Sequence, residues 1–185
     1  MDKKPILYIL ISASLFGLSS PLAKLLLKDI SPITLAGLLY LGAFLGLFLY
    51  SLITKKTSVA AKPQKLEKHD LPWLIGAVIT GGVIAPISQM IGLNLISGFS
   101  VSLLLNMEGV ATAIIAIFFF RENTGKRLWF ALLCMTVAGI LLSWNPDQRK
   151  FNIAGPLLIL LAVVCWGIDN NLTRQISDKN PVQIT

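Results

Sequence analysis

The chain has 185 residues, of which 55% are hydrophobic and only 14% are charged, and its formal net charge is +7. Ordinary soluble proteins carry about 25% charged residues. This composition excludes a soluble globular domain, because the apolar surface exceeds what a core of this size can bury.

Apolar stretches of membrane-spanning length run through the whole chain. About 20 apolar residues in a helix cross a hydrocarbon core of roughly 30 Å. Six stretches qualify: Pro5–Leu27, Ile33–Ile53, Leu71–Leu93, Gly98–Phe120, Arg127–Trp144 and Gly155–Ile176. No small-residue cleavage site ends the first of these, so it is a span rather than a signal peptide. The sequence therefore predicts an all-α polytopic membrane protein.

The sixth stretch repeats the first. Aligning the segment from Pro156 on the segment from Pro5 pairs Leu10 with Leu160, Phe16 with Trp166, Gly17 with Gly167, Leu22 with Leu172 and Lys24 with Arg174. This similarity predicts a five-helix transmembrane repeat at residues 1–146 and the first helix of a second repeat at residues 147–185. An odd number of spans per repeat makes the second repeat inverted. We expect the second repeat to be cut off after this first helix. The expected partner of the chain is therefore the missing second half of the transporter or another copy of the chain.

The basic residues follow the loops rather than a binding face. Twelve lysines and arginines fall on one side of the six-span zigzag and four on the other. The positive-inside rule then predicts a cytoplasmic N-terminus, cytoplasmic loops at Thr54–Asp70 and Arg121–Arg127, and an outer loop at Asn145–Ala154. We expect a multi-pass protein of the plasma or inner membrane, with lipids rather than nucleic acid beside its basic loops.

Glu108 is the most informative polar residue. It lies near the middle of the fourth span, where an ionised carboxylate costs about 3 kcal/mol. We expect it to face an internal cavity and to bind a proton or a cation, although a permanent hydrogen bond to a neighbouring helix is an alternative. The sequence predicts the rest of a substrate- or proton-binding site as Gln89 in the third span, Thr112 one turn after Glu108, and Asp169 and Asn170 in the sixth span.

The third span contains helix breakers. Gly81, Gly82 and Pro86 lie near its centre and predict a kink or hinge, although such breaks also occur in static helices. The short connection Asn94–Ser97 predicts that the third and fourth spans pack as an antiparallel pair. At the end of the fourth span, the charges from Arg121 to Lys126 are interpreted as an interfacial cluster that fixes the helix end.

No enzyme motif appears in the sequence. The lone His69 and the two cysteines do not make a metal site, and there is no phosphate-binding glycine loop and no serine–histidine arrangement. We therefore expect no enzyme activity, no metal and no cofactor.

The chain resembles the EamA family of the drug/metabolite transporter superfamily. The resemblance rests on the first span with SLFGLSSPLAKLLLKDISPITLAGL, the fourth with SLLLNMEGVATAIIAIFFFRE and the fifth with GKRLWFALLCMTVAGILLSW, including Glu122 and the pair Ala138–Gly139. It implies ten spans in two inverted repeats and export or exchange of a small metabolite. The first span lacks the carboxylate that small multidrug-resistance relatives carry there.

Three functions remain open at this point. The first is a secondary transporter that moves a small metabolite by alternating access. The second is a flippase of a lipid-linked intermediate from the same superfamily. The third is a non-transporting scaffold subunit, which a tightly bonded Glu108 with no cavity beside it would favour.

Overall fold

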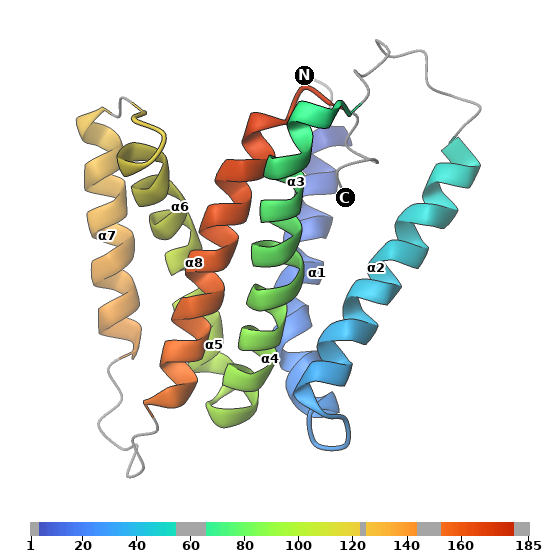
Figure 1. Cartoon of the computed structure of the whole chain (residues 1–185). Helices are drawn as coiled ribbons and strands as arrows, with labels where there is room; N and C mark the ends of the chain where they lie inside the picture. The colour runs from blue at the N-terminus through green and yellow to red at the C-terminus, as the bar shows by residue number, and fades with distance from the viewer. Residues whose placement is uncertain (1–3, 55–65, 123–124, 144–152, 180–185) are drawn as a thin grey trace.

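The computed structural model describes residues 4–54, 66–122, 125–143 and 153–179 (Figure 1). Its helices are α1 Lys4–Leu26, α2 Pro32–Thr54, a 3₁₀ turn Lys68–Asp70, α3 Leu71–Ala77, a π-helical segment Val78–Ile84, α4 Ala85–Leu95, α5 Gly98–Leu105, α6 Met107–Phe118, α7 Lys126–Ser143 and α8 Ala154–Gln175. The described residues contain no β-strand. This confirms the all-α class.

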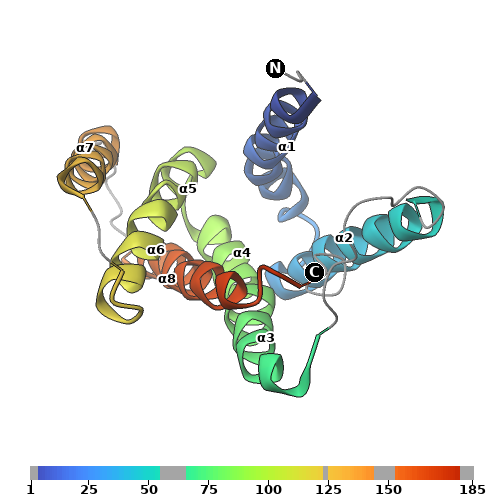
Figure 2. The ribbon, with the colours of Figure 1, turned by 90° about the horizontal axis from the view of Figure 1, so that it is seen from above.

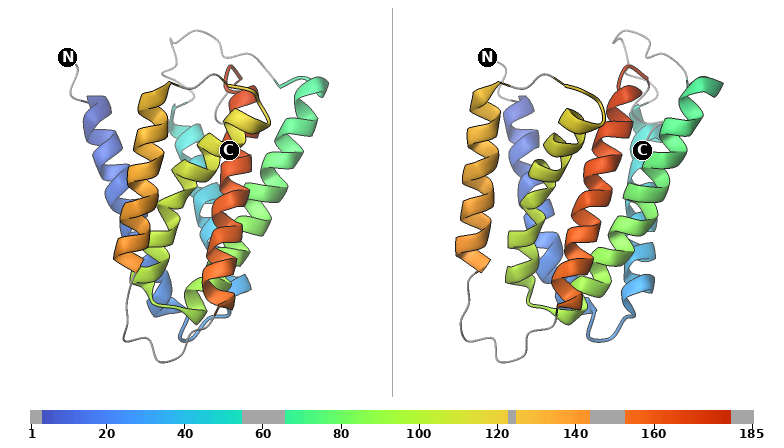
Figure 3. Two further views of the ribbon diagram at one scale, coloured as in Figure 1. Left: turned by 90° about the vertical axis from the view of Figure 1, so that its left-hand side faces the viewer. Right: turned by 60° about the vertical axis from the view of Figure 1, so that its left-hand side comes forward.

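Five helices in the described ranges are long and apolar enough to cross a membrane. They are α1, α2, the continuous helix Lys68–Leu95, the segment Gly98–Phe118 and α8. The fifth predicted stretch forms α7. Successive spans run in alternating directions between the two ends of the bundle, as Figures 1 and 3 show. The protein is therefore a multi-pass membrane protein, whereas its orientation and the division at residue 146 remain predictions.

Helix α8 occupies the centre of the bundle, between α4 and α6 (Figures 1 and 2). Glycines permit this close fit. A Cβ on Gly92 of α4 would lie 2.7 Å from Ile159 Cδ1, and a Cβ on Gly167 of α8 would lie 3.0 Å from the Thr112 amide nitrogen of α6. The predicted antiparallel pairing of the third and fourth spans is therefore wrong along most of their length, because α8 separates them.

The predicted break in the third span appears as a change of helix type. Val78–Ile84 is π-helical, and the chain then returns to an α-helix at Ala85. The Ala85 amide donates to the Thr80 carbonyl, five residues back. Proline at position 86 has no amide hydrogen to donate, which favours the local change in hydrogen bonding. The residues Gly81, Gly82 and Pro86 thus lie at a real irregularity, while hinge motion there remains a prediction.

A second irregularity was not predicted. The fourth span is interrupted at Asn106, between α5 and α6. The Asn106 side-chain amide donates to the Ser102 carbonyl at 3.1 Å. Asn106 keeps helical dihedral angles, so the span continues in the same direction, and Glu108 lies two residues after the interruption.

The two ends of the bundle are held by lysines. At the end where α1 stops, Lys24 Nζ donates to the carbonyl oxygens of Leu93 at 2.5 Å, Asn94 at 3.1 Å and Ile96 at 2.9 Å. These carbonyls lie at the C-terminus of α4, where the last backbone C=O groups have no N–H partner within the helix. At the opposite end, Lys179 Nζ lies 3.6 Å from Asp70 Oδ2, and both side chains are buried.

Candidate functional site

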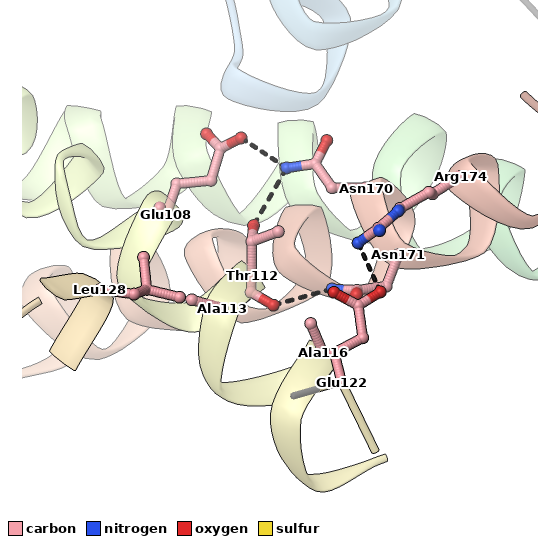
Figure 4. Close-up of a pocket in the computed structure, with 10 residues that line it drawn as sticks. Glu108, Thr112, Ala113, Ala116, Glu122, Leu128, Asn170, Asn171 and Arg174 are labelled. Atoms are coloured by element: carbon pink, nitrogen blue, oxygen red, sulfur yellow. Dashed lines mark hydrogen bonds and ion pairs between the residues drawn. The ribbon is translucent and has the colours of Figure 1, made fainter. Parts of the chain in front are cut away.

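A pocket of about 390 Å³ lies along the contact between α6 and α8 (Figure 4). It is partly polar although its walls belong to membrane-spanning helices. Its lining residues come from α6, the turn after α6, α7 and α8: Glu108, Gly109, Thr112, Ala113, Ala116, Glu122, Leu128, Asn170, Asn171 and Arg174.

The centre of the pocket is a hydrogen-bonded triad across the two helices. Asn170 Nδ2 donates to Glu108 Oε1 at 3.0 Å and to Thr112 Oγ1 at 3.2 Å. Glu108 and Thr112 share a face of α6 because they are four residues apart. The Glu108 carboxylate is partly exposed within the described chain. It keeps acceptor capacity beyond the one bond from Asn170.

Asn171 fixes the separation of the helices beside this triad. Its side-chain amide donates to the Thr112 carbonyl at 2.9 Å and to the Gly167 carbonyl at 2.7 Å. Asn171 is 3% exposed. Its amide group is therefore held by backbone on both helices, and Asn171 is better suited to positioning the wall than to contacting a solute.

An ion pair lies at the end of the pocket. Arg174 Nη1 is 2.5 Å from Glu122 Oε1. Arg121 adopts a left-handed conformation with φ of 53°, and the chain folds back so that the Glu122 amide donates to the Ala116 carbonyl at 3.1 Å. The charges from Arg121 to Lys126 were interpreted as an interfacial cluster that fixes the helix end, and the structure adds a partner for Glu122 on α8 that this interpretation did not include.

The structure brings together three of the five predicted site residues: Glu108, Thr112 and Asn170. Gln89 is buried on α4 and does not line the pocket. Its predicted place beside Glu108 is wrong because α8 lies between the two helices. Asp169 points away from the pocket, since its Oδ2 would lie 2.1 Å from a Cβ on Gly81.

Sequence reasoning did not assign Glu122 or Arg174 to the site. The spacing of Asn170 and Arg174 by four residues was a usable signal, because it places both side chains on one face of α8. Their partners on α6 could not be identified without knowing that α8 packs against that helix.

The chemistry of the pocket suits a polar solute. It offers carboxylate and hydroxyl oxygens, a carboxamide and a guanidinium within a wall that is otherwise apolar. Among the described residues, no group of three or more histidine, cysteine, aspartate or glutamate side chains could hold a metal ion.

Comparison with known proteins places the chain among transporters. It is 24% identical over 180 residues to an "Uncharacterized transporter" from Methanothermobacter thermautotrophicus, and the match covers 89% of this chain and 51% of that relative. The chain thus spans about half the length of the curated relative it matches. No solved structure matches it. The profile of the EamA-like transporter family matches residues 3–144, which is most of the chain. The chain belongs to the EamA-like transporter family.

Proposed function

We propose that the protein is a secondary transporter that exports or exchanges a small polar metabolite across the plasma or inner membrane by alternating access. Its N-terminus is cytoplasmic in this proposal. The family and the transporter-named relative support transport rather than an enzymatic activity. The transport route is completed by a second half of the transporter or by another copy, since inverted repeats each supply part of a central site.

The α6–α8 pocket carries the proposal. Glu108, Thr112 and Asn170 meet at a pocket wall inside two spans, where polar groups are costly unless they have a function or a partner. In the proposal, Glu108 and Asn170 bind hydrogen-bonding groups of the metabolite. The Glu122–Arg174 pair restricts one end of the pocket and opens when the solute passes.

The cavity beside Glu108 favours transport over a scaffold role. A scaffold glutamate would be enclosed by its helix partners, whereas Glu108 lines a pocket of about 390 Å³. Flipping of a lipid-linked intermediate is an alternative, and the experiment below distinguishes it by its substrate.

Transport of candidate metabolites by the protein containing this chain tests the proposal. Glu108→Gln is expected to raise KM for the metabolite at least tenfold, because a charge-assisted hydrogen bond is worth about 1.5–3 kcal/mol. Asp29→Asn, an exposed carboxylate outside the helices, is the matched control and should leave KM unchanged. Glu108→Gln must also insert and fold normally.

Two other results would contradict the proposal. Unchanged KM and kcat in Glu108→Gln would show that this residue serves packing. Translocation of a lipid-linked substrate, without flux of water-soluble metabolites, would favour the flippase.

A further inference from the structure

A second polar cluster lies on the other side of α8, away from the α6–α8 pocket. It joins Tyr40 of α2, Gly81 of the π-helical segment, and Trp166 and Asp169 of α8. None of these residues lines the pocket. Gly81 lies near the middle of its span, so the cluster is deep in the membrane.

The Gly81 carbonyl lacks a helical hydrogen-bond partner. In the π-helical segment the Ala85 amide donates to Thr80, so the next carbonyl, that of Gly81, faces position 86. That position is proline, which has no amide hydrogen. Side chains satisfy the carbonyl instead: Tyr40 Oη donates to it at 2.8 Å and Trp166 Nε1 at 3.3 Å. Both acceptor positions of the oxygen are thereby used.

Asp169 fills the space that a side chain at position 81 would occupy. A Cβ on Gly81 would be 2.1 Å from Asp169 Oδ2, so this position excludes every side chain while Asp169 is present. The other carboxylate oxygen, Oδ1, accepts from Thr173 Oγ1 at 3.0 Å. Oδ2 is thus held at the irregular turn of the third span.

Among the described residues, no basic side chain pairs with Asp169. Of the elements packed on α8, the segments α3, Val78–Ile84, α4 and α5 carry no titratable side chain, and α6 carries only Glu108. Tyr40 reaches the cluster from α2 through its hydrogen bond to the Gly81 carbonyl. On α8 itself, Cys165 is an uncharged thiol and Arg174 is paired with Glu122.

We propose that Asp169 is a proton-binding site separate from the Glu108 pocket, and that its protonation changes the hydrogen bonding of the Gly81 carbonyl. An ionised carboxylate at this depth is costly without a cation, and a proton removes the charge. The proton on Oδ2 makes a new O–H donor beside Gly81. It competes with the longer of the two existing bonds, that of Trp166, and so couples proton binding to the irregular turn between α3 and α4. This proposal is independent of which metabolite the pocket binds.

Emission from Trp166 reports on this cluster directly. Trp73→Phe, Trp129→Phe and Trp144→Phe leave Trp166 as the single tryptophan of the chain. In lipid nanodiscs, its emission is expected to follow a one-proton titration curve as the pH is lowered. Asp169→Asn, which has the same shape without the titratable group, should abolish the titration. Glu108→Gln is the matched carboxylate control and should retain it.

Three results would overturn the proposal: no titration of Trp166 emission, titration that persists in Asp169→Asn, or titration lost in Glu108→Gln. If Asp169→Asn fails to fold, infrared spectroscopy of the unmutated chain decides. A carboxylic-acid C=O band that shifts on ¹³C labelling of aspartate and titrates together with Trp166 emission supports the site. A band that shifts only on labelling of glutamate, or no such band, refutes it.

Discussion

Helices α1 and α8 are aligned copies in the sequence but have different surroundings in the structure. In the most apolar 18-residue stretch of each helix, 39% of the residues of α8 are buried, compared with 11% of those of α1. A Cβ on Gly17 meets nothing within 4 Å, whereas a Cβ on its counterpart Gly167 meets the α6 backbone. Phe16 is 58% exposed, whereas its counterpart Trp166 donates a hydrogen bond to Gly81.

The difference shows that similar residues form a similar helix face in both copies, whereas the sequence of the copy does not determine whether other helices cover that face. In α8 the surface meets α4 and α6, while in α1 it faces outward apart from the end near Lys24. The basic residue of each copy nevertheless contacts another helix end: Lys24 reaches the C-terminus of α4, and Arg174 reaches Glu122 after α6. Matched substitutions in the two copies can therefore measure what burial adds.

The largest difference is expected at the paired glycines. Gly167→Leu should destabilise the protein by about 3 kcal/mol or more, because the new side chain would overlap the backbone of α6 at Ala111 and Thr112. Gly17→Leu should change stability by less than about 0.5 kcal/mol. Unfolding in detergent measures both. Equal losses would mean that α1 is covered in the folded chain.

The paired basic residues should differ by less. Lys24→Met removes three bonds to carbonyl oxygens and should cost about 2 kcal/mol, since bonds from charged donors are the stronger ones. Arg174→Met breaks an ion pair in which the arginine side chain is 60% exposed, which is worth at most about 1 kcal/mol. The same unfolding assay applies, and a larger loss for Arg174→Met would reverse the order.

The aromatic pair should give a smaller effect. Trp166→Phe keeps most of the ring but removes the indole donor to the Gly81 carbonyl, and should cost about 1 kcal/mol or less because Tyr40 still bonds that oxygen. The converse change in the other copy, Phe16→Trp, should be nearly neutral. A double variant, Trp166→Phe with Tyr40→Phe, should lose more than the sum of the two single losses.

Labelling tests the opposite orientation of the copies with the least perturbation. In a Cys134→Ala, Cys165→Ala background, a cysteine at Asp29 follows α1 and one at Ser177 follows α8. An impermeant maleimide added to intact cells should modify Asp29→Cys and spare Ser177→Cys, as the positive-inside rule requires. The reverse labelling would invert the predicted topology, and labelling of both would contradict opposite orientation.

The sequence predicted the helices well because membrane thickness constrains their length. The second span was expected at Ile33–Ile53 and forms Pro32–Thr54. Proline and glycine also identified the irregular turn of the third span, since Pro86 removes a backbone donor. The interruption at Asn106 has no proline or adjacent glycine, and its side chain replaces the missing backbone contact, so local sequence gave no comparable signal.

The candidate site was only partly predictable. The depth of Glu108 in an apolar span was sufficient to single it out, and helical spacing added Thr112. The partners across the site depend on the insertion of α8 between α4 and α6. Pairing of Asn170 with Glu108, and of Arg174 with Glu122, follows from that arrangement and not from distance along the chain.

The central place of α8 also dictates an order of assembly. The ribosome adds about 5–20 residues per second, so the helices that flank α8 emerge seconds before it does. Until then, the Thr112 carbonyl on α6 has no Asn171 amide to donate to it, and the groove beside α4 has no Ile159 to fill it. The growing chain must keep α4 and α6 apart until α8 arrives. Premature closure of α4 on α6 would be a misfolded state that excludes α8.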